Sequence, residues 1–180
     1  VTSCILGYCD SYVDNAVIKA IRNASITTLN SYEEYQLAEK LISLHPWSDM
    51  VKFAKTGGEA CTIAVRIARA ASGKDKVLFC GYHGWHDWYL SANIKNKNNL
   101  NKQLLTGLQT NGVPSNLKNS TIPFLYNKNS FDHEITKYGK DIGVIIMEPT
   151  RGCMPPKGFL QHIKKTAKRI GAVLIFDEIT

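Results

Sequence analysis

Short apolar segments alternate with helical segments along most of this 180-residue chain, and this alternation restricts its fold more than any other feature. The expected strands are 50–54, 76–80, 144–147 and 172–176. Apolar residues at helical spacing predict helices at 13–24, 33–44, 59–71, 131–138 and 159–169. Strands that alternate with helices form a mostly parallel sheet covered by helices on both faces. The sequence therefore predicts an α/β fold.

The composition excludes several classes of protein. With 44% hydrophobic and 21% charged residues, the chain can bury a sizeable core, which excludes intrinsic disorder. No run of about 18 apolar residues occurs, because the apolar segments end early at acidic residues such as Glu148 and Asp177. Residues 1–6 lack the basic and apolar regions of a secretion signal. We therefore expect a cytoplasmic protein with no membrane partner.

Cysteines and charges give no sign of disulfides or of nucleic-acid binding. The 5 cysteines are spread along the chain without a C-x-x-C pair, so reduced thiols are expected. The formal charge of +7 is dispersed, with local density only near the end of the 159–169 helix. Cations there suit the helix dipole. A solvated helix end is thus favoured over a nucleic-acid site at Lys164, Lys165, Lys168 and Arg169.

The stretch 93–129 is rich in Asn, Lys, Ser and Gly and shows no strand or helix period. We expect a long loop, partly ordered by the turn at 112–114, that contributes to specificity.

The first candidate site is the turn Thr56-Gly57-Gly58-Glu59, which lies between an expected strand and an alanine-rich helix. Glycines let the backbone approach a ligand closely, and the N–H groups of a helix N-terminus favour an anion such as a phosphate. The alternative is a tight structural turn in which Glu59 only balances the helix dipole. The turn is neither a P-loop nor a G-x-G-x-x-G fingerprint.

The second candidate site is the aromatic loop 81–89, which follows the expected strand 76–80. Loops at the C-terminal edge of a parallel sheet commonly bind ligands. Tyr82 could offer its ring to a planar ligand, and Tyr89, Trp85 or Trp88 could line a pocket. For these last three, covering the edge of the sheet is the favoured interpretation.

Two histidines and a carboxylate in the same loop, His83, His86 and Asp87, raise a metal alternative. No further ligand stands at a recognisable spacing, so we expect no metal site.

The third candidate site is Asp177-Glu178, directly after an apolar strand. A carboxylate there needs a cation or a hydrogen-bond donor. The partner is either a structural cation or the protonated ring nitrogen of a ligand. The same argument applies to Glu148, although Pro149 could simply turn the chain there.

These segments together resemble a known family. The motifs are T-G-G-E-A at 56–60, Y-H-G at 82–84, E-P at 148–149, P-K-G-F-L at 156–160 and F-D-E at 176–178. This ordered series resembles the class III aminotransferases, which are fold-type I enzymes that use pyridoxal 5'-phosphate (PLP). Within that family the segments 66–70 and 112–114 are similar to the glutamate-1-semialdehyde 2,1-aminomutase-like branch. The resemblance implies a three-layer α/β/α large domain with a mostly parallel sheet.

The resemblance also implies how a cofactor would be held. Gly57 and Gly58 match the phosphate-binding turn of the family, and Tyr82 matches the aromatic residue that stacks on the pyridine ring. Ile179 falls where the family packs an apolar side chain on the other face of that ring.

Asp177 is the residue from which catalysis is expected, since it matches the aspartate that pairs with the ring nitrogen and keeps the ring protonated. Glu148 falls at a family acid near the cofactor. The lysine that binds the cofactor covalently in the family is expected beyond Thr180.

Two features depart from the family. Ser or Thr commonly follows the first glycine of the turn, so Gly58 removes a hydroxyl donor and keeps the backbone N–H. Family members are also considerably longer. Residues 1–180 are therefore expected to form part of a PLP-binding large domain, without the N-terminal segment, the lysine region and the C-terminal small domain. Because the family builds its sites at a dimer interface, a homodimer is expected, and these residues alone should show no turnover.

The function that the resemblance implies is PLP-dependent transfer of an amino group between small-molecule donors and acceptors. An aminotransferase and an aminomutase-like isomerase both fit. The alternatives are a catalytically silent relative or phosphate-ligand module, and a metal hydrolase that uses His83, His86 and Asp87.

Overall fold

The computed structural model describes residues 4–24, 28–150 and 152–179. The chain divides into two compact units, Val1–Phe53 and Ala54–Thr180. Among the described residues, no helix combines the length and the apolar character needed to cross a bilayer.

The first unit contains α1 (Ser11–Ala24) and α2 (Tyr32–Leu44), which confirms both predicted helices. Ser31 caps α2, since its side chain accepts a hydrogen bond from the Glu34 N–H. Apolar residues on both helices stay exposed within the unit, among them Ile21 at 57% and Leu37 at 50%. This unit therefore has little core of its own.

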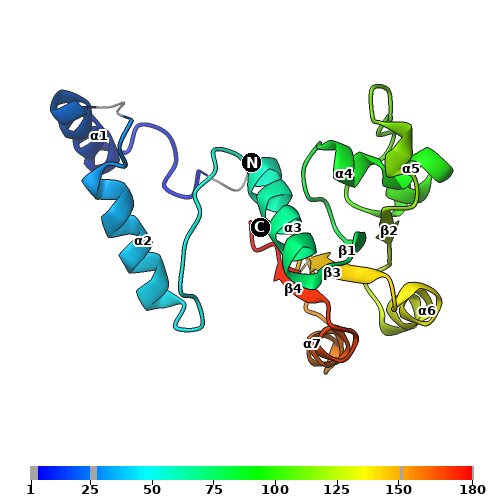
Figure 1. Ribbon diagram of the computed structural model, residues 1–180. Helices are drawn as coiled ribbons and strands as arrows, with labels where there is room; N and C mark the ends of the chain where they lie inside the picture. Colours follow the sequence, from blue (N-terminus) through cyan, green and yellow to red (C-terminus); the bar gives the residue numbers. More distant parts are fainter. Residues whose placement is uncertain (1–3, 25–27, 151, 180) are drawn as a thin grey trace. The chain divides into compact units, whose positions relative to one another are not determined.

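The second unit holds a four-stranded parallel sheet in the order β2-β1-β3-β4 (Figure 1). Its elements in chain order are α3 (Gly57–Ser72), β1 (Lys76–Cys80), α4 (Asp87–Leu90), α5 (Ala92–Lys95), the 3-10 helices η1 (Asn99–Lys102) and η2 (Ser115–Leu117), β2 (Thr121–Pro123), α6 (Lys128–Tyr138), β3 (Ile142–Met147), α7 (Phe159–Ile170) and β4 (Val173–Phe176). The predicted strand 76–80 is confirmed with the same bounds.

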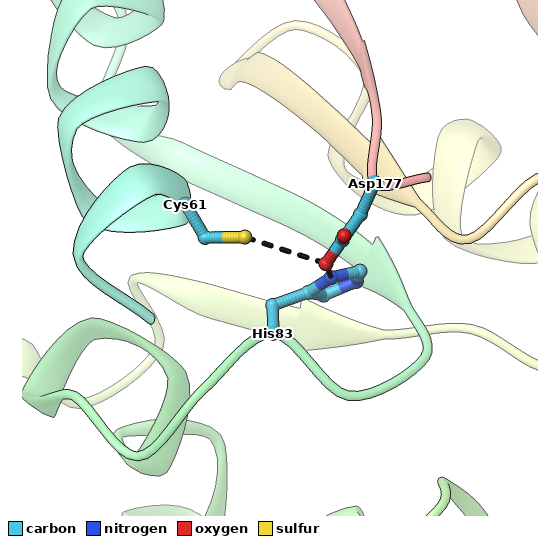
Figure 2. A group of neighbouring side chains, drawn as sticks. All are labelled: Cys61, His83 and Asp177. Carbon is cyan, nitrogen blue, oxygen red and sulfur yellow. Dashed lines mark hydrogen bonds and ion pairs between the residues drawn. The ribbon is translucent and has the colours of Figure 1, made fainter. Parts of the chain in front are cut away.

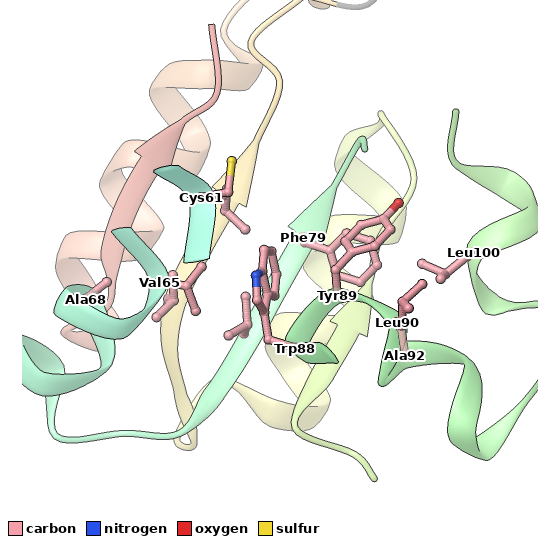
Figure 3. Close-up of a cluster of buried hydrophobic side chains, with 12 residues drawn as sticks. Cys61, Val65, Ala68, Phe79, Trp88, Tyr89, Leu90, Ala92 and Leu100 are labelled. Carbon is pink, nitrogen blue, oxygen red and sulfur yellow. The ribbon is translucent and has the colours of Figure 1, made fainter. Parts of the chain in front are cut away.

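Alternate residues of the central strands enter two separate cores, as the pleat of a strand requires. Phe79 and Ile146 pack with α3, α4 and α5, whereas Leu78 and Ile145 pack with α6 and α7. Figure 3 shows the first core, in which Cys61, Val65 and Ala68 of α3 lie on the same side of the sheet as Phe79 and Trp88. The sheet is covered on both faces, which confirms the expected three-layer α/β/α architecture.

Helix α3 has well-defined signals at both ends. Thr56 and Glu59 form a capping box, in which each side chain accepts a hydrogen bond from the backbone of the other residue. Gly73 ends the helix in the left-handed region with φ of 65°. The capping box fixes where the first turn of α3 begins, and Gly73 fixes where the helix ends.

The segment 93–129 is more ordered than the sequence predicts. It contains η1, η2 and the short strand β2, which pairs in parallel with β1. Gln103 is buried; its side-chain oxygen accepts a hydrogen bond from the Gly81 N–H at 2.8 Å, and its amide donates to the Phe124 carbonyl at 3.2 Å. The segment is therefore tied to the start of the aromatic loop.

Two strand predictions need correction. Residues 50–54 form no strand: the described strands pair only with one another. Met50 is 86% exposed, so the expected burial of this segment is also absent there. The expected buried strand at 172–176 forms as β4 but lies at the edge of the four-stranded sheet, so its residues are only half-buried and Phe176 is 40% exposed.

Truncating the centre of the sheet should destabilise the second unit. Ile145 is 0% exposed, so Ile145→Ala should lower the free energy of unfolding by about 2–5 kcal/mol, through lost burial and the cavity left behind. Urea denaturation followed by circular dichroism would measure this. Leu104→Ala, at a side chain that is 57% exposed, is the matched control and should change stability by no more than about 0.5 kcal/mol. Equal losses in both variants would contradict the assigned core.

Candidate functional site

A cavity of about 460 Å³ lies where the N-terminus of α3 meets the segments that follow β1 and β4. Parallel strands end at the same edge of a sheet, so residues far apart in sequence come together there. The cavity is lined by Thr56, Gly57, Gly58, Tyr82, His83, Gly84, Trp85, His86, Asp177 and Ile179.

Most of the predicted site residues meet in this one cavity. Gly57, Gly58, Tyr82, Asp177 and Ile179 all line it. They come from the α3 turn, the aromatic loop and the segment after β4. The structure therefore brings together residues from the beginning and the end of the second unit, such as Gly57 and Ile179.

Glu148 is predicted to lie near the cofactor, but it does not line the cavity. It is 4% exposed and lies behind Gly81, where an added Cβ would come within 2.6 Å of Glu148 Oε2. Its carboxylate still influences the site, because its charge acts on the thiol of Cys61.

The α3 end of the cavity carries backbone donors. The Glu59 N–H donates to Thr56 Oγ1, and the Ala60 N–H donates to the Thr56 carbonyl. Within the part of the chain that the structure describes, the N–H groups of Gly57 and Gly58 have no acceptor. Two free donors at the positive end of a helix can bind an anion.

The capping role of Glu59 leaves the N–H groups of Gly57 and Gly58 free. The Glu59 carboxylate accepts hydrogen bonds from the N–H groups of Lys55 and Thr56, so it turns back from the cavity. The structural explanation for Glu59 therefore does not compete with a ligand at Gly57 and Gly58.

Buried aromatic side chains hold the aromatic loop in place. The Tyr89 hydroxyl donates to the Gly81 carbonyl at 2.9 Å, and Trp88 Nε1 donates to Thr62 Oγ1 at 3.1 Å. The half-buried Tyr82 ring meets the Tyr89 ring edge to face, with centroids 5.6 Å apart. Trp88 and Tyr89 thus belong to the core. Trp85 differs from the expectation, since it is 69% exposed and lines the cavity.

Asp177 is held by donors from two other segments (Figure 2). Its Oδ2 accepts a hydrogen bond from His83 Nδ1 at 2.8 Å and from Cys61 Sγ at 3.3 Å. Its Oδ1 accepts only from the Ile179 N–H, at 3.3 Å, within the described residues. The second ring nitrogen of His83 lies 3.2 Å from the Cys80 carbonyl. Oδ2 is thus fixed by the protein, and Oδ1 is the less engaged oxygen.

These contacts set the charge of the group. Burial acts to raise the pKa of the Asp177 carboxyl, but the hydrogen bond and charge of His83 and the Cys61 hydrogen bond outweigh it and hold that pKa below its usual range. Burial, followed by the charge of Asp177, raises the pKa of the Cys61 thiol to about 12. At neutral pH the cavity therefore contains an aspartate anion, and Cys61 is a hydrogen-bond donor rather than a nucleophile.

The metal alternative is not favoured by this geometry. The structure does not gather His83, His86 and Asp87; in the described part of the chain, the donor atoms that lie within 4.8 Å of one another belong to Cys61, His83 and Asp177. Two ligands of a tetrahedral zinc ion lie about 3.3 Å apart, given bonds of about 2 Å. The separation of 2.8 Å between His83 and Asp177 is instead that of a charge-assisted hydrogen bond.

Cys61 and His83 contact Asp177, and the sequence did not predict either contact. They stand 116 and 94 residues from Asp177. A contact at such separation leaves no local pattern. A signal did exist for His83, since it follows Tyr82 in the Y-H-G motif.

The sequence model of the family described as "Aminotransferase class-III" matches residues 1–180. The chain belongs to the class-III aminotransferase family. This confirms the resemblance that the motifs suggest.

Curated members of the class-III aminotransferase family share about one third of the residues. The 3-aminobutyryl-CoA aminotransferase of Cloacimonas acidaminovorans is 33% identical over 97% of this chain and 40% of its own length. The glutamate-1-semialdehyde 2,1-aminomutase of Lawsonia intracellularis is 35% identical over 97% of this chain and 41% of its own length. The chain thus spans about two fifths of these relatives.

Solved structures of a transaminase and an aminomutase show the same fold. A transaminase with PLP bound has a TM-score of 0.85 at 23% identity, over 98% of this chain and 42% of its own. A glutamate-1-semialdehyde aminomutase from Pseudomonas aeruginosa has a TM-score of 0.74 at 19% identity, over 98% and 39%. The architecture of these residues is therefore that of the fold-type I transaminases.

The state of Cys61 can be tested by thiol labelling. At about pH 8, iodoacetamide should modify the exposed Cys4, Cys9 and Cys153 of the native protein and spare Cys61, because a buried thiol with a pKa of about 12 holds almost no thiolate. Peptide mass spectrometry would locate the labels. The buried Cys80 serves as control, and unfolding should expose both. Fast native labelling of Cys61 would contradict its hydrogen bond to Asp177.

Proposed function

We propose that this chain forms part of the PLP-binding domain of an enzyme that transfers amino groups. The observation that carries the proposal is that one cavity is lined both by an aspartate anion and by two free N–H groups of a helix N-terminus. Such a pairing suits a ligand with a cationic ring nitrogen at one end and a phosphate at the other.

The phosphate end of the ligand fits the α3 turn. The N–H groups of Gly57 and Gly58 can donate to phosphate oxygens, and the helix dipole favours the negative charge. A Cβ at Gly58 would collide with the His86 ring, so the glycine keeps the backbone open to the cavity while that ring stays in place.

The ring end of the ligand fits Asp177, Tyr82 and Ile179. Bound PLP supplies an electron sink that stabilises the negative charge left when a substrate amine loses its α-proton. Asp177 would keep the ring nitrogen of bound PLP protonated, with Oδ1 as the less engaged oxygen, because His83 and Cys61 hold Oδ2. Tyr82 and the 58% exposed Ile179 offer one flat and one aliphatic surface to the faces of the ring. Glu148 remains a proposed contributor from behind Gly81.

The substrates we propose are small amino donors and acceptors. The names of the relatives, a 3-aminobutyryl-CoA aminotransferase and several glutamate-1-semialdehyde aminomutases, support both transamination and isomerisation. The 93–129 segment, tied to the cavity loop by Gln103, is the proposed contributor to substrate choice.

We further propose a homodimer located in the cytoplasm. Exposed apolar residues on α1 and α2 support a partner surface, since large exposed apolar areas mark interfaces. The cytoplasmic location is supported by five free cysteines. The lysine that would hold the cofactor covalently is proposed to lie beyond residue 180.

The absorption spectrum of the full-length protein tests the cofactor. We expect a visible band after incubation with PLP, lost on borohydride reduction and shifted by an amino donor, because a lysine-bound cofactor responds to both treatments. A protein that stays colourless with added PLP would contradict the proposal and favour a catalytically silent relative.

Substituting Asp177 tests the ring-nitrogen partner. In the full-length enzyme, Asp177→Asn should still bind PLP but lose transamination by on the order of 100-fold or more, because the amide cannot stabilise the protonated ring. Stopped-flow or steady-state amino transfer would measure the loss. Asp132→Asn is the matched control, since Asp132 forms a similar pair with His162, at 2.6 Å, outside the cavity. Near-normal rates in Asp177→Asn would contradict the assignment.

A further inference from the structure

We propose that His86 binds the phosphate group of the cofactor and provides the side-chain donor that position 58 cannot. This inference rests on the proposed function and assigns a further binding residue to the phosphate end of the same cavity. It follows from how the loop 84–86 packs on the first turn of α3.

The imidazole of His86 occupies the space beside Gly58. A Cβ added at Gly58 would lie 2.9 Å from both Cδ2 and Nε2 of His86, closer than real Cβ atoms approach other atoms. Position 58 and the His86 ring therefore compete for one volume on the cavity wall. With glycine at 58, the ring takes that volume.

Backbone packing holds the ring there. A Cβ at Gly84 would lie 2.5 Å from the Gly58 Cα, so the backbones of the two glycines are in direct contact. Gly84 also has φ of 93°, which favours glycine. The aromatic loop is thus pressed onto the start of α3, and His86 follows Gly84 by two residues.

The ring nitrogens of His86 are available to a ligand. Within the described residues, they make no hydrogen bond or ion pair, although the residue is half-buried. His83 differs, because its ring nitrogens contact Asp177 and Cys80. The ring of His162 also has a partner, Asp132. His86 is therefore the cavity-lining histidine with a free donor.

The position of this donor suits a phosphate. It stands beside the free N–H groups of Gly57 and Gly58, at the positive end of the 16-residue helix α3. An imidazole N–H adds a charge-assisted hydrogen bond to a phosphate oxygen. The carboxylate of the cavity, Asp177, is engaged by His83 and Cys61 and leaves His86 to the anion.

The test compares PLP with pyridoxal, which lacks the phosphate. The apo form of the full-length protein is titrated with each compound, and binding is followed by quenching of tryptophan fluorescence. Wild-type protein should bind PLP more tightly than pyridoxal. His86→Ala should weaken PLP binding about tenfold or more and leave pyridoxal binding unchanged, because only the phosphate contact is lost.

Further variants separate a binding role from a structural one. His86→Gln keeps an N–H donor and should retain most of the preference for PLP. Gly58→Ser alone should weaken PLP binding, because its Cβ meets the His86 ring. The double variant Gly58→Ser/His86→Ala should recover affinity, since the serine hydroxyl then fits the vacated volume. His133→Ala, at an exposed histidine outside the cavity, is the control and should behave as wild type.

The outcomes are distinguishable. An unchanged ratio of PLP to pyridoxal affinity in His86→Ala, beside normal binding by wild-type protein, would overturn this inference alone. Equal weakening of both compounds would also overturn it, because the residue would then only support the fold. Failure of wild-type protein to bind PLP would overturn the proposed function, and this inference with it.

Discussion

The desolvated carboxylate of Asp177 is the constraint on which the rest of the second unit depends. A charge taken out of water must be compensated, and here the compensation comes from Cys61 on α3 and from His83 in the loop after β1. The same bonds therefore fasten a helix, a loop and the end of β4 to one another. The contacts that orient Asp177 in the cavity are therefore also tertiary contacts of the fold.

The opposite end of the cavity is set by backbone rather than by charge. Gly58 and Gly84 touch because neither has a side chain, and the capping box of Thr56 and Glu59 decides where the free N–H groups begin. The two ends of the cavity are thus formed by different interactions. Hydrogen bonds orient the Asp177 carboxylate at one end, and the absence of side chains leaves room for the proposed anion at the other.

Sequence reasoning succeeded where the cause of a structure is local. The hydrophobic period and the turn residues predicted β1 and α3, and the acid that directly follows an apolar strand, Asp177, does line the cavity. It failed where pairing decides the outcome. Residues 50–54 are mostly apolar but pair with none of the described strands, whereas the three-residue β2 forms because β1 offers it a partner. Cys61 was missed for the same reason, since nothing near it in sequence signals an aspartate 116 residues away.

Gln103 has a consequence for how this scaffold can diversify. Its buried amide joins the Gly81 N–H to the Phe124 carbonyl, so the 93–129 segment is anchored at its root, while Leu104 and Leu105 beyond it are 57% and 41% exposed. Substitutions at these exposed residues are therefore expected to affect the cavity less than a substitution of Gln103. An exchange of this segment with that of a relative should therefore leave the cavity loop in place only where a buried side-chain amide replaces both hydrogen bonds of Gln103.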